Sequence, residues 1–428
     1  MRVAIVGAGF GGMAAAHDLV NAGHDVTIYE ASGNPGGLAA GFKEPHWSSS
    51  VEHFYHHWFA SDSAMLGLLD ELNLRQNAVY RRPVTVMYHK GDFYPLDSAL
   101  SALTFPGFKF FDMVRFGLVT VYLKFFSGWK NLEKHTAHNW MRKYYGERLY
   151  STQFEPLLIG KFGPHYQDVN MAWFWARFKV RTPRLGTYQG GFQQFSNDFA
   201  ANLEGRGVKI LLNTPVQRIT HADNGGITIT LASGDEHFDR ALVTLAPGML
   251  AKLAPDLPEN YLQGLLKLKS MGAVVMVLSL KHKLSEKGFY WFSLPKTAGF
   301  PFLALVEHTN FVPSDQFGGD HIVYLGDYLD TGHEYFKLSQ EELLQRFLPS
   351  LSRINPQFTP EWVKKSWLFR TPYAQPVPLV NHSANIPDIR TPILGLYFAS
   401  MSQVYPWDRG TNFAVKIARE AAQLMLQD

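Results

Sequence analysis

The chain opens with a short apolar segment, an apolar helical pattern and a second apolar segment. Residues 2–6, RVAIV, are rich in β-branched side chains and predict a strand. Residues 12–23, GMAAAHDLVNAG, predict a helix that ends at Gly23, because glycine is favoured just past a helix end. Residues 24–30, HDVTIYE, predict a second strand. This order of elements indicates a parallel βαβ unit.

A glycine-rich turn joins the first predicted strand to the helix. It carries Gly7, Gly9 and Gly12 in G-x-G-x-x-G spacing, with Phe10 and Gly11 between them. Such glycines allow a tight turn and a close approach of the backbone to a pyrophosphate, and the helix N-terminus favours negative charge. Glu30 follows Gly12 by 18 residues, where an acid can bind a ribose diol and disfavours a 2′-phosphate. The unit therefore predicts a dinucleotide site, and not one for NADP.

Composition narrows the class of protein. The 428 residues suffice for two or three domains, and 46% hydrophobic with 18% charged residues indicates a folded globular protein. A net charge of +3 is too small to indicate nucleic acid as a partner. The absence of cysteine excludes disulfides, thiolate metal sites and a cysteine-tethered flavin, and it fits a cytoplasmic location.

Residues 108–129 form the most membrane-like segment. Four charged side chains, Lys109, Asp112, Arg115 and Lys124, interrupt its apolar pattern and argue against a membrane span. The pattern predicts a helix with one broad apolar face. We favour burial of that face inside the protein, and the alternative is a peripheral contact with a bilayer surface.

A second glycine pair, Gly36-Gly37, follows Glu30 in the segment ASGNPGGLAAGF, residues 31–42. With the first turn, it resembles the superfamily of protoporphyrinogen oxidases, phytoene desaturases and flavin amine oxidases. In that family the pair passes under FAD, and the arginine that usually follows it is replaced here by Leu38. The resemblance implies FAD as a non-covalent cofactor.

Two further segments carry the resemblance. Residues 207–248 predict short strands that, in the family, bring Val216 to the adenine and Ala246 to the nucleotide. Residues 392–425 predict a strand, a loop and a helix that begins near Asn412 and faces the flavin. The candidate cofactor residues are Gly7, Gly9, Phe10, Gly11, Gly12, Glu30, Ala31, Gly36, Gly37, Leu38, Val216, Ala246, Asp408, Thr411 and Asn412.

The resemblance implies an α/β fold with two domains. One is a Rossmann-like FAD-binding domain of the glutathione-reductase type, and the other is a discontinuous α+β substrate domain. We expect the FAD-binding domain at 1–60, 186–250 and 390–428, and the substrate domain at 61–185 and 251–389. Within the first substrate segment, residues 84–96 predict a hairpin.

Residues 50–59, SVEHFYHHWF, gather three histidines. The stretch resembles the Glu-x-Gly-x-His segment of the family, with Phe54 in the glycine position. As a strand it would place His53 and His57 on one face and His56 on the other. A metal site would need His53 and His57 on a helix, so we expect no metal. We expect a histidine that lines the flavin or the substrate, and ordinary packed histidines are the alternative.

Proton transfer has three candidate residues. His56 and His57 can exchange a proton near pH 7. Tyr188 precedes Gly190-Gly191, which resembles the glycine pair at which the family re-enters the FAD-binding domain. The catalytic candidates are therefore His56, His57 and Tyr188.

Cationic residues mark a candidate substrate site. Lys161 lies between glycines in a predicted loop, and Arg177 and Arg181 share a face if they are helical. A cationic face beside a cleft can bind a carboxylate or a diphosphate, and a solvated helix face is the alternative. The expected partner is a small-molecule substrate that is apolar or carries a diphosphate.

The leading functional hypothesis is an FAD-dependent oxidoreductase that dehydrogenates or desaturates its substrate by hydride transfer. Met276 stands where amine oxidases carry a water-holding lysine, which favours desaturase-like or protoporphyrinogen oxidase-like chemistry. The rival is a non-redox flavoenzyme resembling UDP-galactopyranose mutase, whose pattern is closer to residues 405–415, YPWDRGTNFAV. A flavin-bearing binding protein without turnover is a third class.

Overall fold

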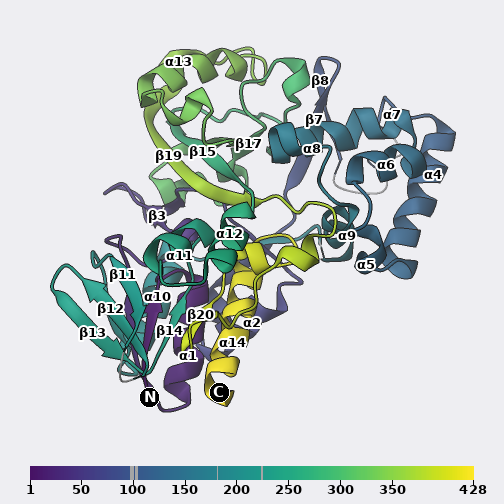
Figure 1. Cartoon of the computed structure of the whole chain (residues 1–428). Coiled ribbons are helices and arrows are strands. Elements are labelled where there is room, and N and C mark those ends of the chain that lie inside the picture. Colours follow the sequence, from purple (N-terminus) through teal and green to yellow (C-terminus); the bar gives the residue numbers. More distant parts are fainter. Residues whose placement is uncertain (97–100, 102–104, 181, 223–224) are drawn as a thin grey trace.

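A parallel sheet carries the N-terminal unit in the computed structural model, which describes residues 1–96, 101, 105–180, 182–222 and 225–428 (Figure 1). Its strands run in the order β10-β2-β1-β14-β20, and each pair is parallel. The strands are β1 (Arg2–Val6), β2 (Asp25–Tyr29), β10 (Lys209–Leu211), β14 (Arg240–Val243) and β20 (Leu396–Phe398). The predicted strands at 2–6 and 24–30 and their parallel connection are confirmed.

Helices from distant parts of the chain cover one face of the parallel sheet. They are α1 (Phe10–Asn21), α2 (Ser63–Glu71), α10 (Phe192–Glu204) and α14 (Thr411–Gln427). Val3 and Ile5 of β1 pack against this layer. Helices α1 and α14 approach closely at Gly11, where a Cβ atom would lie only 3.1 Å from the carbonyl oxygen of Ala414.

The opposite face of the parallel sheet carries a small antiparallel sheet and two helices. The elements are β11 (Arg218–His221), β12 (Ile227–Leu231), β13 (Gly234–Phe238), α11 (Pro247–Leu253) and α12 (Glu259–Lys267). Ala4 and Val6 of β1 pack on this side, opposite to Val3 and Ile5. This alternation buries both faces, as a parallel sheet requires. The predicted Rossmann-like fold class is confirmed.

A large mixed sheet forms the second half of the molecule. Its strand order is β19 (Val363–Pro376), β15 (Ser270–Leu280), β18 (His321–Leu329), β17 (Ala304–Glu307), β16 (Phe289–Ser293), β7 (Val84–His89) and β8 (Asp92–Pro95). The predicted hairpin is confirmed as β7 and β8. Met276 lies in the cluster that packs under α13 (Gln340–Leu351). An argument about reaction type from Met276 therefore has no structural support.

A helical module lies beside the large mixed sheet (Figure 1). It comprises α4 (Phe110–Val121), the π-helical turn η3 (Tyr122–Phe126), α5 (Trp129–Leu132), α6 (Ala137–Tyr145), α7 (Glu147–Leu149), the π-helical turn η4 (Tyr150–Phe154), α8 (Glu155–Phe162) and α9 (Met171–Val180). Its aromatic core includes Tyr145, Phe154 and Trp173. Short sheets connect the halves through β3 (Gly41–Phe42) with β4 (Val51–Glu52), and through β5 (Trp58–Phe59), β9 (Leu185–Tyr188) and β6 (Ala78–Arg81).

The expected burial of residues 108–129 is wrong. The segment is helical as predicted, but Phe110, Phe111 and Phe126 are 76%, 81% and 77% exposed. Phe108, Phe116, Val119, Leu123 and Trp129 pack onto the module, whereas Val114, Leu118, Val121, Tyr122 and Phe125 are exposed like the three phenylalanines above. Within the described ranges, none of the helices combines the length and apolar character needed to cross a bilayer.

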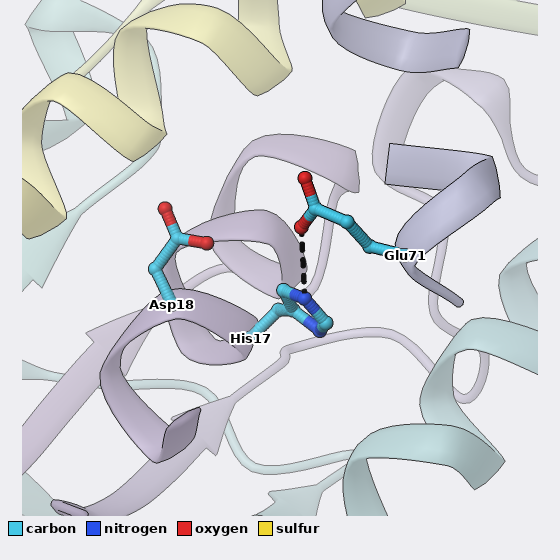
Figure 2. Close-up of side chains that lie close together, drawn as sticks. All are labelled: His17, Asp18 and Glu71. Atoms are coloured by element: carbon cyan, nitrogen blue, oxygen red, sulfur yellow. Dashed lines mark hydrogen bonds and ion pairs between the residues drawn. The ribbon is translucent and has the colours of Figure 1, made fainter. Parts of the chain in front are cut away.

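A polar network ties α1, α2 and α14 together, and Figure 2 shows three of its members, His17, Asp18 and Glu71. His17 Nε2 lies 3.1 Å from Glu71 Oε2, and ligand atoms of His17, Asp18 and Glu71 lie within 4.8 Å of one another. Arg419 donates to Asp18 at 2.9 Å and to both Glu71 oxygens at 2.9 and 3.0 Å. Burial of His17, and then the charge of Arg206, lower the pKa of its imidazole. The Arg419 guanidinium contacts both carboxylates, so we interpret the cluster as structural.

Replacing Arg419 tests this network. We expect Arg419→Met to lower the free energy of unfolding by about 1–3 kcal/mol, because the half-buried Asp18 carboxylate loses its charged donor. The measurement is chemical unfolding at saturating FAD. Arg390→Met is the matched control, since Arg390 pairs with Asp428 at the surface and such pairs contribute at most about 1 kcal/mol. Equal losses in the two variants would contradict a structural network at Arg419.

Candidate flavin and substrate site

The parallel sheet brings several sequence signals to one edge. Strands that run parallel end at the same side, where ligands bind in open α/β sheets. The glycine turn follows β1, Glu30 follows β2, residues 244–246 follow β14 and residues 400–402 follow β20. The candidate cofactor residues of the first 40 positions therefore meet Ala246 and the start of α14 at one edge.

The structural requirement for glycine differs between the positions of the first turn. Gly7 has φ +109°, and a Cβ there would lie 2.7 Å from Thr244 Oγ1. A Cβ at Gly12 would lie 2.0 Å from the Gly7 carbonyl oxygen, so both positions need glycine for packing. At Gly9 the nearest atom to such a Cβ is Gly37 Cα at 3.9 Å, and φ is an ordinary −72°. Packing within the protein therefore does not require glycine at position 9.

The second glycine pair lies directly against the first. Gly36 N donates to Ala8 O at 2.9 Å, and Gly9 and Gly36 form a bridge of parallel type. Gly36 and Gly37 have φ of +123° and +58°, which favours glycine at both. Leu38 follows at a half-buried position. Two stretches of bare backbone thus face one another.

Glu30 is fixed at the border of this space. Its carboxylate accepts hydrogen bonds from Ala8 N at 2.8 Å and from Ser32 N and Oγ at 2.9 and 2.8 Å. Thr214 N donates to Glu30 O at 2.8 Å and brings the half-buried Val216 nearby. Ala31 is exposed beside Glu30.

Two helix N-termini at this edge have no side-chain cap. Helix α1 starts after Gly9 and α14 after Gly410, and neither has an acid in its first turn. Helix α14 begins at Thr411, one residue before the predicted start. Unsatisfied N–H groups and the positive dipole end suit phosphate oxygens and flavin carbonyls.

The side chains at these helix starts differ in whether they have contacts within the protein. Thr411 Oγ1 is buried and has no hydrogen-bond partner among the described residues, so a polar group from outside the chain would satisfy it. Asn412 Oδ1 instead accepts from Met65 N at 3.1 Å. The Phe10 ring packs between Phe192 and Phe195 in the core and leaves only its backbone at the turn. The open glycine space, the uncapped helices and Thr411 fit an extended FAD.

The histidine stretch does not form the single strand considered in the sequence analysis. β4 ends at Glu52 and β5 begins at Trp58, with irregular backbone between them. Glu52 is buried and accepts hydrogen bonds from Phe192 N at 3.0 Å and Tyr324 OH at 3.1 Å. This anchoring holds the chain to α10 and β18, and the backbone turns away after it. Burial raises the pKa of Glu52 to about 6.

The three histidines have separate environments. His53 stacks on Phe369 with ring centres 4.3 Å apart, and His57 lies edge-on to Phe59 at 4.9 Å. His56 Nδ1 lies 2.5 Å from Phe54 O. Burial lowers the pKa of His56 to about 4, and the charge of Arg409 adds to this. The helical arrangement required for the metal alternative is not formed.

Tyr188 lies in β9 with its hydroxyl group directed at α10. The hydroxyl donates to Asp198 at 2.6 Å and accepts from Asn77 Nδ2 at 2.8 Å. Its ring packs with Trp58 and Phe195 in the core. Burial, and then the bond to Asp198, raise the pKa of Tyr188.

Lys161 shares an aromatic ring with a cation that the sequence analysis missed. Lys161 lies in the last turn of α8 and not in a loop, and its Nζ is 4.4 Å from the centre of the Tyr328 ring. The Arg409 guanidinium lies 4.9 Å from the same centre and donates to the Tyr328 hydroxyl. Arg409 Nε also donates to Gln375 at 2.9 Å. The only signal in the sequence was the position of Arg409 directly after the candidate Asp408.

Arg177 and Asp408 bind each other, although the sequence assigned them to different ligands. Arg177 Nη1 lies 2.8 Å from Asp408 Oδ2, and Trp173 Nε1 donates to Asp408 Oδ1 at 3.1 Å. The Arg177 guanidinium also stacks on Trp173 at 4.7 Å. Arg181 lies outside the described residues.

Two cavities lie between these elements, in the part of the chain that the structure describes. A small one of about 20 Å³ is lined by Trp173, Gln375, Asp408 and Arg409, and so lies beside the Arg409 guanidinium. A larger one of about 230 Å³ lies between residues 49–50, 187–191 and 308–317. The smaller cavity touches Arg409, two residues before α14 begins at Thr411.

Comparison with known proteins identifies the family to which this chain is similar. Residues 10–426 match the family described as flavin containing amine oxidoreductase. A Mycobacterium tuberculosis protein named "Putative flavin-containing monoamine oxidase AofH" is 25% identical over 286 residues, which cover 61% of each chain. The chain thus matches less than two thirds of the length of this relative. The zeta-carotene desaturase of Synechocystis sp. is 39% identical over 77 residues, or 18% of this chain and 16% of the relative.

Solved structures share the whole fold. A "Putative protoporphyrinogen oxidase" from Exiguobacterium sp. 255-15 superposes with a TM-score of 0.75 at 18% identity, covering 100% of this chain and 99% of that one. Reduced UDP-galactopyranose mutase gives 0.77 at 16% identity, covering 100% and 95%. These low identities establish the fold, whereas the family match covers nearly the whole sequence. The chain therefore belongs to the flavin containing amine oxidoreductase family, and its cofactor is FAD.

Proposed function

We propose that the protein is an FAD-dependent oxidoreductase that removes a hydride and a proton from a small-molecule substrate. The observation that carries this proposal is the edge of the parallel sheet, where open glycine backbone and two uncapped helix N-termini meet. When bound there, FAD supplies the capacity to accept a hydride from a C–H bond. We assign Glu30 to the ribose and Thr411 to the flavin end.

The substrate site that we propose is the wall formed by Lys161, Tyr328 and Arg409. Both cations lie within 5 Å of the centre of one ring, at 4.4 Å for Lys161 and 4.9 Å for Arg409, which concentrates positive charge around Tyr328. Such a pair would bind a carboxylate or phosphate group through charge-assisted hydrogen bonds. Trp173 and Tyr405 line the adjoining cavity and would exclude water from an apolar part of the substrate. The substrate class is therefore a small molecule with an anionic group next to an apolar body.

We assign proton acceptance to the His56–His57 segment, with His56 preferred. A carbonyl oxygen can only accept a hydrogen bond, so the contact with Phe54 O places the proton of His56 on Nδ1. Nε2 is then the basic atom. It would take the proton that leaves the atom next to the oxidised carbon, while the hydride leaves that carbon and a double bond forms. Tyr188 is less suitable, because Asp198 and Asn77 already hold its hydroxyl group.

A mutase-type function is the second candidate. The paired cations at Tyr328 could bind the diphosphate of a nucleotide sugar, and this observation favours a reaction like that of UDP-galactopyranose mutase. Such a reaction involves no net oxidation of the substrate. The family match supports the oxidoreductase more strongly.

A substitution at Gly9 tests the cofactor site. We expect Gly9→Val to fold, because the backbone is in an ordinary extended conformation and a Cβ has no close neighbour. Its branched side chain would occupy the space that we assign to the pyrophosphate, so the Kd for FAD should rise at least ~100-fold. The measurement is flavin absorbance per protein and FAD titration of the apoprotein. Gly67→Ala in α2, also in open space, is the control and should bind FAD normally.

The buried neutral state of His56 predicts acid sensitivity. The folded pKa is about 4, below the unfolded value of about 6.5. The unfolded chain therefore takes up a proton first as the pH falls, and stability is lost between about pH 6.5 and about pH 4. His56 contributes at most about 3 kcal/mol to this loss. We expect FAD-saturated His56→Gln to lose less stability than wild type between about pH 7 and about pH 5.

The exposed His221 provides the control for the pH measurement. His221→Gln makes the same substitution at an exposed position and should leave the pH dependence of urea unfolding unchanged. A His56→Gln variant that loses stability in parallel with the wild type would contradict burial of a neutral imidazole at this site.

Anaerobic mixing separates the two functions. Amines, polyenes and porphyrinogens that carry carboxylates should bleach the oxidised flavin of the holoprotein if it is an oxidoreductase. Binding of UDP-sugars to the reduced protein, without bleaching of the oxidised one, would instead support the mutase. We expect Arg409→Met to weaken binding of an anionic substrate by about 10–100-fold through loss of a charge-assisted contact. Failure of every compound class to bleach or bind would count against both functions.

A further inference from the structure

We propose that the exposed side of α4 and η3 docks onto a lipid bilayer that contains anionic lipids. We call this surface the aromatic face. Its apolar side chains range from 44% to 81% exposure. They are Phe110, Phe111, Val114, Leu118, Val121, Tyr122, Phe125 and Phe126. Contiguous exposed apolar side chains of this size mark an interaction surface rather than ordinary protein surface.

The aromatic face is one side of an amphipathic helix. Its members recur at intervals of three and four residues, which places them along one side of α4. The other side packs into the helical module through Phe116, Val119 and Leu123. In Figure 1, α4 lies at the outer edge of the module, away from the parallel sheet. The helix is therefore held by the protein on one side and presents its broad apolar side outward.

Cations surround the aromatic face. Lys109, Lys124, Lys130 and Lys143 are all exposed. Lys124 Nζ lies 5.7 Å above the Phe125 ring, and Lys143 Nζ lies 5.2 Å above the Tyr144 ring. Long lysine stems that lie along aromatic rings, with the ammonium group in water, suit the boundary between acyl chains and lipid headgroups.

Nearby acids do not cancel this positive charge. Asp112 accepts hydrogen bonds from Lys109 N and Arg148 Nη1, both at 2.9 Å. Glu147 pairs with Arg142 at 2.7 Å. These carboxylates are matched by arginines, so the rim lysines remain available to anionic headgroups. Attraction of a cationic rim to such headgroups would add to burial of the aromatic side chains.

A bilayer suits this face better than a second copy of the chain. In a two-fold symmetric dimer each face would meet an identical face, so cationic rims would lie against cationic rims. An anionic bilayer has the opposite charge and an apolar interior, and it therefore complements both parts of the surface. The helix would lie in the plane of the interface rather than span it, as its interrupting charges require.

Co-sedimentation of the FAD-loaded protein with vesicles tests the proposal. We expect binding to phosphatidylcholine vesicles that contain phosphatidylglycerol, and weaker binding without phosphatidylglycerol. The combined variant Phe110→Ser, Phe111→Ser, Leu118→Ser and Phe125→Ser should weaken binding by at least about 100-fold, because the inserted apolar area is lost. The control is Leu266→Ser with Leu394→Ser, which removes side chains 66% and 82% exposed elsewhere and should bind normally.

Charge reversal tests the rim separately. Lys109→Glu with Lys124→Glu should reduce binding to the anionic vesicles by roughly tenfold or more and leave binding to neutral vesicles unchanged. Lys252→Glu with Lys267→Glu, on α11 and α12, makes the same charge change on exposed positions far along the chain and should have no such effect. Flavin content and melting temperature confirm that each variant is folded.

Three outcomes would overturn the proposal. In the first, the wild-type holoprotein remains in the supernatant with both kinds of vesicle. In the second, the aromatic variant binds as well as wild type. In the third, light scattering would show a concentration-dependent dimer that the aromatic variant abolishes, and the aromatic face would then be a contact between copies of the chain.

Discussion

The close approach of two glycine segments, residues 7–12 and residues 36–37, sets the geometry on which the site depends. A Cβ at Gly37 would lie 3.2 Å from Gly9 Cα, so the two backbones face each other with no side chain between them. Packing inside the protein explains glycine at Gly7 and Gly12, whereas it leaves room at Gly9. The parallel strands then add Glu30 and the start of α14 at the same edge. A sheet that ended its strands at different edges could not assemble these parts.

Charge in the proposed site is arranged by pairing and by burial. Asp408 pairs with Arg177, while Arg409 and Lys161 both contact the ring of Tyr328. Burial, and to a smaller extent the positive charge of Arg409, lower the pKa of His56. An imidazole that stays neutral over a wide pH range can accept a proton without first losing one. Burial and the charge of Arg409 thus both favour the neutral form of His56.

Local patterns predicted the fold well, since each signal was short-range. The glycine spacing, the strand at residues 2–6 and the hairpin at 84–96 depend on neighbours in the chain, and the structure contains all three. Family resemblance then placed α14 to within one residue. Membership of the family and the identity of the cofactor followed from the same motifs.

Side-chain partners were predicted poorly, because they come from distant segments. Nothing near Asp408 in the sequence indicates that it pairs with Arg177, 231 positions earlier. Glu52 is anchored by Tyr324, and no local pattern could show that this would interrupt a strand. The aromatic face of α4 was misjudged for a related reason. Amphipathic periodicity says which side chains share a face, but not whether another element covers them.

The order in which the chain builds its sheets has a consequence for how the protein can be divided. The large mixed sheet takes β7 and β8 from residues 84–95 and its other strands from residues 270–376, while the parallel sheet takes strands from the start, middle and end. A single cut therefore releases no self-contained lobe. Nicking by a protease should leave fragments that stay associated, and recombination between relatives would have to exchange several segments at once to transfer one lobe intact.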